Sequence, residues 1–273
     1  MCRTFSVSRN GYYRWRRRPE SRRTIENRRL DAHIRAIYTK YKGRYGSPKI
    51  TDKLNDMGFR VGKNRVARRM KEAGLRSIVR RKYRPTTDSK HSFPVADNVL
   101  KRDFSTSGPN QIWVSDITYI GTERGWLYLA VFLDLFSRMV VGWALSTSLS
   151  AQMVLMALHR GIRSRRPGAG LIIHSDRGVQ YACKEFRKAL ATHHFVQSMS
   201  RKGDCWDNAV AESFFGILKS ELIYRERFKG HEDTLKAVFE YIEVFYNRDR
   251  KHSTLGYYTP AQYEEIMKSA VCF

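Results

Sequence analysis

Three acidic residues carry the chemistry that this sequence suggests: Asp116, Asp176 and Glu212. Asp116 lies in an aromatic and β-branched run at 111–121, which is typical of a strand. Asp176 ends a short apolar run and precedes an Arg-Gly pair, which indicates a buried strand leading into a loop. Glu212 falls in a helical stretch at 208–219. Two acids at strands and one on a helix are therefore available to a single site.

Carboxylates gathered in this way suit a hard divalent cation, because Mg²⁺ takes oxygen ligands and holds substrate phosphates at its remaining positions. Two such ions, roughly 4 Å apart, activate the attacking oxygen and stabilise the leaving one in phosphoryl transfer. Without a cation, the clustered charges would repel one another and would be costly to bury. For any one acid in isolation, the simpler interpretation is a solvated strand end or a salt-bridge partner.

Positive charge is concentrated in the first third of the chain. Of the formal net charge of +25, residues 1–94 carry +21, from 28 lysines and arginines against 7 aspartates and glutamates. Residues 95–273 hold 23 against 19 and carry only +4. This asymmetry predicts a polyanionic partner, most simply double-stranded DNA.

The cysteines and the apolar runs exclude other classes of protein. No pair among the four cysteines has zinc-ligand spacing, and no disulfide framework is indicated. No apolar run reaches transmembrane length, and the first residues lack the hydrophobic region of a signal peptide. We therefore expect no membrane association and a cytoplasmic bacterial protein, associated with the nucleoid when it is bound to DNA.

The N-terminal third is expected to be helical. Residues 1–25 form either a flexible basic arm or part of a helix-turn-helix, with Ser8 capping a short helix, and both alternatives stay open. Residues 26–78 show three short amphipathic helices, as in a helix-turn-helix DNA-binding domain, although a plain three-helix bundle with a solvated basic face would share the pattern. The last of these helices presents the residues expected to contact DNA: Lys63, Arg65, Arg68 and Arg69.

A basic linker at 79–105 follows, in which Arg80, Arg81 and Lys82 are expected to follow the phosphate backbone. The domain at 106–273 then shows three strand candidates, at 111–121, 126–134 and 139–146. Alternating helices and strands come next. Strands joined by hairpins at the start, followed by alternating helices and strands, predict a mixed α/β sheet with helices on both faces. A long apolar helix at 232–246 is expected to pack in the core, with Phe239 among its buried residues.

Five motifs occur in order along this domain. They are Trp113-Val-Ser-Asp116-Ile-Thr-Tyr, Leu133-Asp-Leu-Phe-Ser-Arg138, His174-Ser-Asp176-Arg-Gly-Val-Gln-Tyr181, Asp207-Asn-Ala-Val-Ala-Glu212-Ser-Phe-Phe and Tyr246-Asn-Arg-Asp-Arg-Lys-His252-Ser-Thr-Leu-Gly-Tyr257. Together they resemble the DDE transposases of bacterial insertion sequences, specifically the OrfB-type product of the insertion-sequence-three group, which shares the retroviral-integrase catalytic core. Thirty-five residues separate Asp176 from Glu212, the spacing expected of that group.

The resemblance implies a ribonuclease H-like core after the helix-turn-helix domain, with Asp116, Asp176 and Glu212 as catalytic metal ligands. It also implies cleavage at transposon ends and strand transfer into target DNA with Mg²⁺, for which Mn²⁺ is expected to substitute. The expected partners are the end and target DNA, further copies of the chain in a homo-oligomer on that DNA, and the product of an upstream reading frame, fused or separate.

Four further residues lie near the three acids in sequence. Lys219 follows Glu212 by two helical turns and Asn208 precedes it by one, so both are expected on its helix face, in contact with DNA. His174 points to the same side of its strand as Asp176, and packing is the favoured role over substrate orientation. Asp134 is expected to make structural hydrogen bonds rather than to serve as a fourth metal ligand. The basic turn at 247–252 is expected to touch DNA or a second subunit.

Two other functions compete with transposition. One is a ribonuclease H-fold nuclease that cuts DNA without joining it, and the other is a DNA-binding regulator with an inactive α/β domain. The basic N-terminal third and the Tyr246–Tyr257 motif favour the transposase over the nuclease. The three intact acids argue against the regulator.

Overall fold

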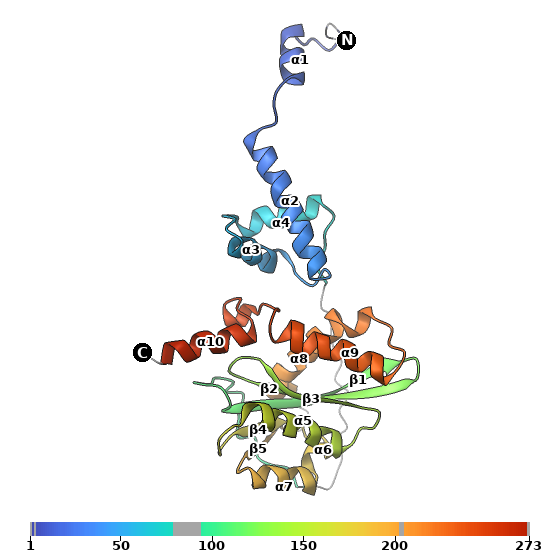
Figure 1. Ribbon diagram of the computed structural model, residues 1–273, viewed down its shortest axis with the longest axis vertical. Coiled ribbons are helices and arrows are strands. Elements are labelled where there is room, and N and C mark those ends of the chain that lie inside the picture. The colour runs from blue at the N-terminus through green and yellow to red at the C-terminus, as the bar shows by residue number, and fades with distance from the viewer. Residues whose placement is uncertain (1, 3, 79–93, 202–204, 272–273) are drawn as a thin grey trace. The chain divides into compact units, whose positions relative to one another are not determined.

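The computed structural model describes residues 2, 4–78, 94–201 and 205–271, and Arg80, Arg81 and Lys82 lie outside these ranges (Figure 1). The chain divides into two compact units, Met1–Ile78 and Val79–Phe273. The finer division of each unit into an arm, a helical domain, a linker and a core stays a prediction.

The first unit consists of helices. Ser8 caps the first of them by accepting a hydrogen bond from the Gly11 N–H, and this helix buries no side chain. The three that follow pack around a small apolar core, because each presents the apolar stripe that its sequence predicts. The helices are α1 (Arg9–Arg16), α2 (Arg22–Lys40), α3 (Ser47–Asp56) and α4 (Lys63–Glu72), and their buried residues include Leu30, Ile34, Ile37, Ile50, Leu54, Val66 and Met70.

The second unit is built on a mixed five-stranded sheet of order β3-β2-β1-β4-β5. The first three strands are antiparallel, and β4 and β5 are added parallel to β1. The predicted mixed α/β sheet is therefore confirmed. Its strands are β1 (Ile112–Thr122), β2 (Gly125–Asp134), β3 (Val140–Ser146), β4 (Ile172–Ser175) and β5 (Val196–Met199). Between them lie α5 (Ala151–Arg165), α6 (Val179–Ala182) and α7 (Lys184–Thr192).

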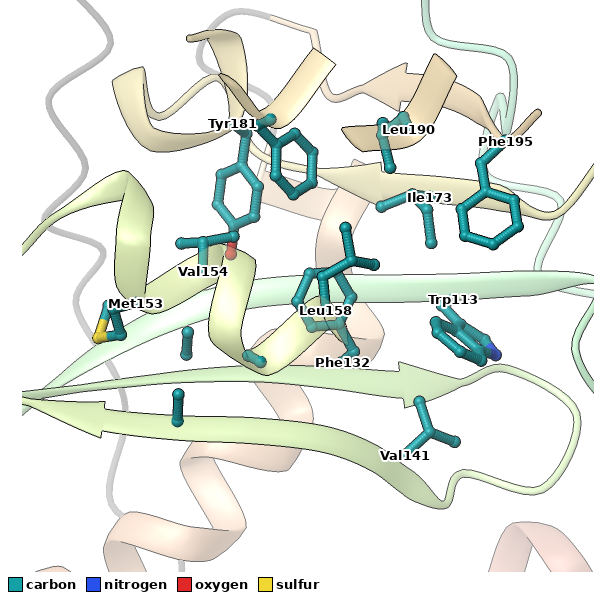
Figure 2. Packing of buried hydrophobic residues seen from close by; sticks show 14 of the residues in the cluster. Trp113, Phe132, Val141, Met153, Val154, Leu158, Ile173, Tyr181, Leu190 and Phe195 are labelled. Carbon is teal, nitrogen blue, oxygen red and sulfur yellow. The ribbon is translucent and has the colours of Figure 1, made fainter. Parts of the chain in front are cut away.

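One face of this sheet and the helices α5, α6 and α7 enclose the main apolar core (Figure 2). Trp113 and Phe132 reach it from the strands, and Leu158 and Tyr181 from the helices. Gly142 lets β3 and α5 approach closely, since a Cβ atom there would lie 2.2 Å from the Ala157 carbonyl oxygen. This packing holds β1 and β4, the strands that carry the two aspartates, in a fixed frame.

The rest of the chain forms helices and short helical turns after β5. They are the 3₁₀ turn η1 (Cys205–Asn208), α8 (Ala209–Glu221), η2 (Ile223–Arg225), α9 (His231–Phe239), the π-helix η3 (Glu240–Tyr246), η4 (Ser253–Leu255) and α10 (Pro260–Val271). The helix expected at 232–246 is thus present, but its second half is a π-helix. Val238, Ile242 and Phe245 are buried as expected, whereas Phe239, at the junction, is 54% exposed instead of buried.

Most of the turn after the π-helix is buried, but Arg248 is exposed, so contact of this turn with DNA or a second subunit stays a prediction for Arg248. The Asn247 side chain bonds both backbone groups of Val140, at 3.0 Å each, and so covers the edge of β3. Arg250 pairs with Glu221 at the end of α8, at 2.8 Å, and both are more than nine-tenths buried. Lys251 and His252 are buried as well. This turn therefore fastens α8 to the sheet.

No helix in the described ranges is long and apolar enough to cross a membrane.

Candidate active site

The register of the sheet brings Asp116 and Asp176 together. β1 and β4 are parallel neighbours, and Val114 pairs with His174. Asp116 follows two residues later in β1, and Asp176 comes directly after the end of β4. The Asp116 Oδ1 accepts the Ile117 N–H at 2.7 Å, and the Asp176 Oδ1 accepts the Gly178 N–H at 2.9 Å. Both residues are partly buried.

Helix α8 places Glu212 beside this pair. The Asn208 amide, at the N-cap of α8, donates to the Ser115 carbonyl oxygen at 3.1 Å, one residue before Asp116 in β1. Glu212 follows in the first turn of the helix, near the positive end of the helix dipole. Asn208 is only 4% exposed. Asn208 therefore links α8 to β1, and its expected contact with DNA stays a prediction.

The electrostatics of Asp116 show how closely these groups lie. Burial raises the pKa of the Asp116 carboxyl well above its usual range, and the negative charge of Asp176 adds to the rise. Glu212 acts in the same direction, whereas the Ile117 N–H and the Lys219 ammonium oppose it. Burial in turn lowers the pKa of Lys219, against the attraction of Asp116. One set of interacting charges thus contains the three acids and the lysine.

Among the described residues, no group of three acidic, histidine or cysteine side chains lies close enough to hold one metal ion. Asp116, Asp176 and Glu212 therefore interact through space without forming a finished ligand sphere. Their donor atoms are all carboxylate oxygens, which fit a hard divalent cation. A bound cation would offset the repulsion between these negative charges.

Asp134 and His174 have structural roles. Asp134 is fully buried and accepts the N–H groups of Asn110 and Phe136, at 2.7 and 2.9 Å, as its predicted structural role requires. His174 is fully buried too, and its Nδ1 lies 2.8 Å from the Ser198 hydroxyl of β5. Burial lowers the pKa of His174 to about 4, so the imidazole is neutral at pH 7.

Asp207, which the sequence did not single out as functional, holds the segment before α8 in place. Its fully buried carboxylate receives the Arg201 backbone N–H at 2.9 Å and the Arg201 side chain at 3.0 Å. Arg102 and Asn98, from the chain that precedes β1, donate to it at 2.9 and 2.8 Å. Donors from two distant segments so close to Glu212 could not be inferred from sequence spacing, because only the fold brings them together.

The predicted DNA contacts on α4 divide into two kinds. Lys63 and Arg68 are exposed. Arg65 donates to the Asn27 side-chain oxygen of α2 at 2.8 Å, and Arg69 forms a two-armed ion pair with Asp31 of the same helix. Arg65 and Arg69 thus also fasten α4 to α2, and their contact with DNA stays a prediction. Lys63 and Arg68 stay predicted DNA contacts.

Comparison with known proteins agrees with this architecture. Models of the "Integrase core domain" match residues 106–205 and 212–267, and a model of an "HTH-like domain" matches residues 24–83. The transposase InsF for insertion sequence IS3A of Escherichia coli (strain K12) is 43% identical over 266 residues, covering 97% of this chain and 92% of that protein. The insertion element IS600 uncharacterized 31 kDa protein of Shigella sonnei is 42% identical over 265 residues, 97% of each chain.

Among solved structures, a chain of the simian T-cell lymphotropic virus intasome in complex with PP2A regulatory subunit B56 gamma matches 85% of this chain and 74% of its own. Its TM-score is 0.50 at 17% identity, which supports the fold. The family models and the relatives together define a polynucleotidyl transferase of the DDE integrase class. Within that class, the chain belongs to the InsF family of insertion-sequence transposases.

Proposed function

We propose that this transposase cuts DNA at the ends of its insertion sequence and joins the freed 3′ ends to target DNA, with Asp116, Asp176 and Glu212 as the catalytic acids. The observation that carries the proposal is the electrostatic coupling of these three carboxylates beside Lys219. Carboxylates that raise one another's pKa in a polynucleotidyl transferase are expected to share a cation.

The cation that best fits the three acids is Mg²⁺, because the donor set is all oxygen, and Mn²⁺ is expected to replace it. When bound, the ion supplies charge stabilisation at the phosphate and activates the attacking oxygen. The acids are not yet within one ligand sphere. We infer that Glu212 moves toward Asp116 and Asp176 when DNA and metal bind, since it lies in the first turn of α8, directly after the segment that Asp207 holds.

Lys219 has a different role in the proposal. A charged lysine does not ligate a cation, but its ammonium group lies near Asp116, half-buried on the same helix as Glu212. A fixed positive charge there holds the phosphate next to the scissile bond and so orients the 3′ oxygen for in-line attack. Lys219 is thus a substrate-binding residue, whereas the acids hold the metal.

Residues 1–94 supply the affinity for double-stranded DNA, through Lys63 and Arg68 on α4 and through the linker that contains Arg80, Arg81 and Lys82. Joining two transposon ends to one target requires more than one active site, so we propose that the chain acts as a homo-oligomer on DNA. The product of an upstream reading frame, fused or separate, is a further proposed partner. We place the reaction in the bacterial cytoplasm, at the nucleoid.

The experiment is cleavage and strand transfer of a labelled transposon-end duplex with Mg²⁺, followed on sequencing gels. We expect Asp116→Asn, Asp176→Asn and Glu212→Gln each to lower both rates by at least about a thousandfold, because each removes a metal ligand. DNA binding in the presence of a chelator should stay within about twofold of wild type. Near-normal joining by one variant would remove that residue from the site, and cleavage without joining by the wild type would favour the nuclease.

A further inference from the structure

An arginine lies directly beside the candidate active site, on the side of β5. Arg177 follows Asp176 in the chain, and its Nε donates to the Ser200 carbonyl oxygen at 2.7 Å. Ser200 comes directly after β5, and its N–H donates to the Ser175 carbonyl oxygen of β4 at 2.9 Å. Since β4 and β5 are parallel, their carboxyl ends meet at one edge of the sheet. Arg177 is therefore held across this edge, next to Asp176.

Two more arginines extend this positive charge toward α8. Arg201 comes directly after Ser200, and its side chain donates to the Asp207 carboxylate at 3.0 Å. Arg102 reaches the same carboxylate at 2.9 Å, from the segment that precedes β1. The side chains of Arg201 and Arg102 are 55% and 45% exposed, although the carboxylate between them is fully buried. We name Arg102, Arg177 and Arg201 the arginine rim.

The backbone that presents Arg102 has an unfavourable conformation. Lys101 and Arg102 have φ angles of 46° and 66°, so two successive residues with a Cβ atom lie in the left-handed region. Asn98 holds this turn, because its Oδ1 accepts the Lys101 N–H at 2.9 Å and its amide donates to Asp207 at 2.8 Å. Strained backbone of this kind persists where the surrounding contacts fix it, and it is common at functional sites.

The arginine rim is connected to both aspartates of the candidate active site. At one end, Arg177 adjoins Asp176 in the chain. At the other end, Asp207 adjoins Asn208, whose amide bonds β1 one residue before Asp116. A continuous path of hydrogen bonds and neighbouring residues thus leads from one aspartate through the arginine rim to the other. The arginine rim therefore borders the site itself.

The arginine rim carries more positive charge than its bonded acid removes. Two of its three guanidinium groups share the single carboxylate of Asp207, and the nearby Asp103 carboxylate receives the Ser105 N–H at 3.0 Å. Guanidinium groups stay charged in proteins and bind phosphate through parallel N–H donors. Phosphates of one DNA strand follow one another about every 3.4 Å along the duplex axis. A strand held at the acids would thus bring its neighbouring phosphates to these arginines.

We propose that the arginine rim binds a backbone phosphate next to the scissile bond, with Arg177 as the principal contact. The proposal rests on the proposed function, because that function places the scissile phosphate at the three acids. Lys219 is assigned there to a phosphate near Asp116, whereas Arg177 adjoins Asp176. One cation beside each aspartate would hold the strand at two points and so fix its direction across the site.

The test measures binding of DNA by the intact protein in a chelator, so that no reaction takes place. The probes are transposon-end duplexes in which one phosphate at a time, among about three on each side of the cleaved bond, is replaced by a neutral methylphosphonate. In wild type, we expect one of these replacements to weaken binding roughly tenfold through the loss of a charge-assisted contact with Arg177. In Arg177→Gln, the same replacement should weaken binding by less than about twofold, because the partner charge is already missing.

Matched variants make the result specific to Arg177. Arg187→Gln removes an exposed arginine of α7 in the same unit, and should keep every loss seen in wild type. Arg177→Lys should keep part of the loss, since the charge stays and its geometry changes. Glutamine retains an amide donor for the Ser200 carbonyl oxygen, and each loss is a ratio of two affinities of one variant, so a general weakening cancels. Equal losses in wild type and Arg177→Gln at every position would contradict the proposal, as would no loss in wild type.

The catalytic proposal is tested independently of the arginine rim. Asp116→Asn should keep the loss at the position assigned to Arg177, because the binding measurement needs no metal. If Asp116→Asn also kept strand transfer, the proposed function would fail while the phosphate contact stood. A loss that disappears in Arg177→Gln, with all three acids intact, reports on the arginine rim alone.

Discussion

At the scale of the single residue, Lys219 is proposed to bind the substrate, whereas the three acids are proposed to hold the metal. Its ammonium group is half-buried near Asp116, where burial lowers its pKa and the aspartate opposes that shift. We expect Lys219→Ala to slow cleavage and joining by about ten- to a hundredfold, because a charge-assisted contact with the end phosphate is lost. Lys219→Arg should retain part of the activity, since the charge stays and its geometry changes.

Lys188→Ala is the matched control for Lys219→Ala, because Lys188 is an exposed lysine on α7 of the same unit. It should leave both rates unchanged. Binding of Mg²⁺ to the free protein, followed by calorimetry, should be almost the same in all three variants. A cysteine at position 219 should crosslink to terminal DNA. Wild-type kinetics in Lys219→Ala together with no crosslink would make Lys219 an ordinary surface lysine.

Among the site residues, spacing within one element predicted neighbours well. Asp116 and Asp176 were predicted at strand ends and Lys219 on the helix of Glu212, and in the structure these four residues interact as one set of charges, with Asp116 inside β1 and Asp176 directly after β4. Asn208 has equally suitable spacing, but α8 begins only at Ala209, and the Asn208 side chain bonds β1. Arg65 and Arg69 likewise found acceptors on α2, which no local pattern reveals.

At the scale of the element, Asp207 positions the start of α8. Its carboxylate is fully buried between Arg102 and Arg201, and the hydrogen bonds from Arg201 hold the pKa of Asp207 far below its usual range. We expect Asp207→Asn to lower the free energy of unfolding by about 1–3 kcal/mol at pH 7. The lower part of that range is favoured, because both arginine side chains are about half exposed to solvent.

The pKa of Asp207 determines how the stability contributed by this carboxylate changes with pH. The pKa of Asp207 is lower in the folded than in the unfolded chain, where it is about 3.9, so its contribution is present above about pH 4 and is lost as the pH falls. The stability difference between wild type and Asp207→Asn, from urea titrations, should therefore begin to shrink below about pH 5 and go on shrinking as the pH falls toward the much lower pKa of the folded chain. The exposed acid Glu232 provides the control, and Glu232→Gln should change stability by less than about 0.5 kcal/mol. A stability difference that does not depend on pH would contradict this role of the Asp207 carboxylate.

Helices and strands were predicted where apolar residues recur at a regular spacing in the sequence. Strand candidates at 111–121, 126–134 and 139–146 correspond within two residues to β1, β2 and β3. The helix expected at 232–246 continues after Phe239 as a π-helix, in which Ile242 and Phe245 are buried as expected, whereas the expected burial of Phe239 is wrong. The burial of Arg250 in the following turn was also missed, since Arg250 finds its buried partner Glu221 only in the folded chain.

At the scale of the whole molecule, most of the positive charge lies in the first third of the chain. Residues 1–94 carry +21 of the net +25, and Lys63 and Arg68 of α4 are exposed cations within this third. Each phosphate contact contributes about 0.9 to the slope of log K against log salt concentration. We expect the double variant Lys63→Ala and Arg68→Ala, in the intact chain, to lower that slope by about 1.8.

The matched control for Lys63→Ala and Arg68→Ala removes the same charge from the second unit. Lys184 and Lys188 are exposed on α7, and the double variant Lys184→Ala and Lys188→Ala should leave the salt slope within about 0.5 of wild type. Fluorescence anisotropy of a labelled duplex, titrated at several salt concentrations, measures both slopes. Equal losses in the two double variants would mean that long-range charge, and not contact by α4, sets the affinity. An unchanged slope in both would assign DNA binding to other cations of the chain.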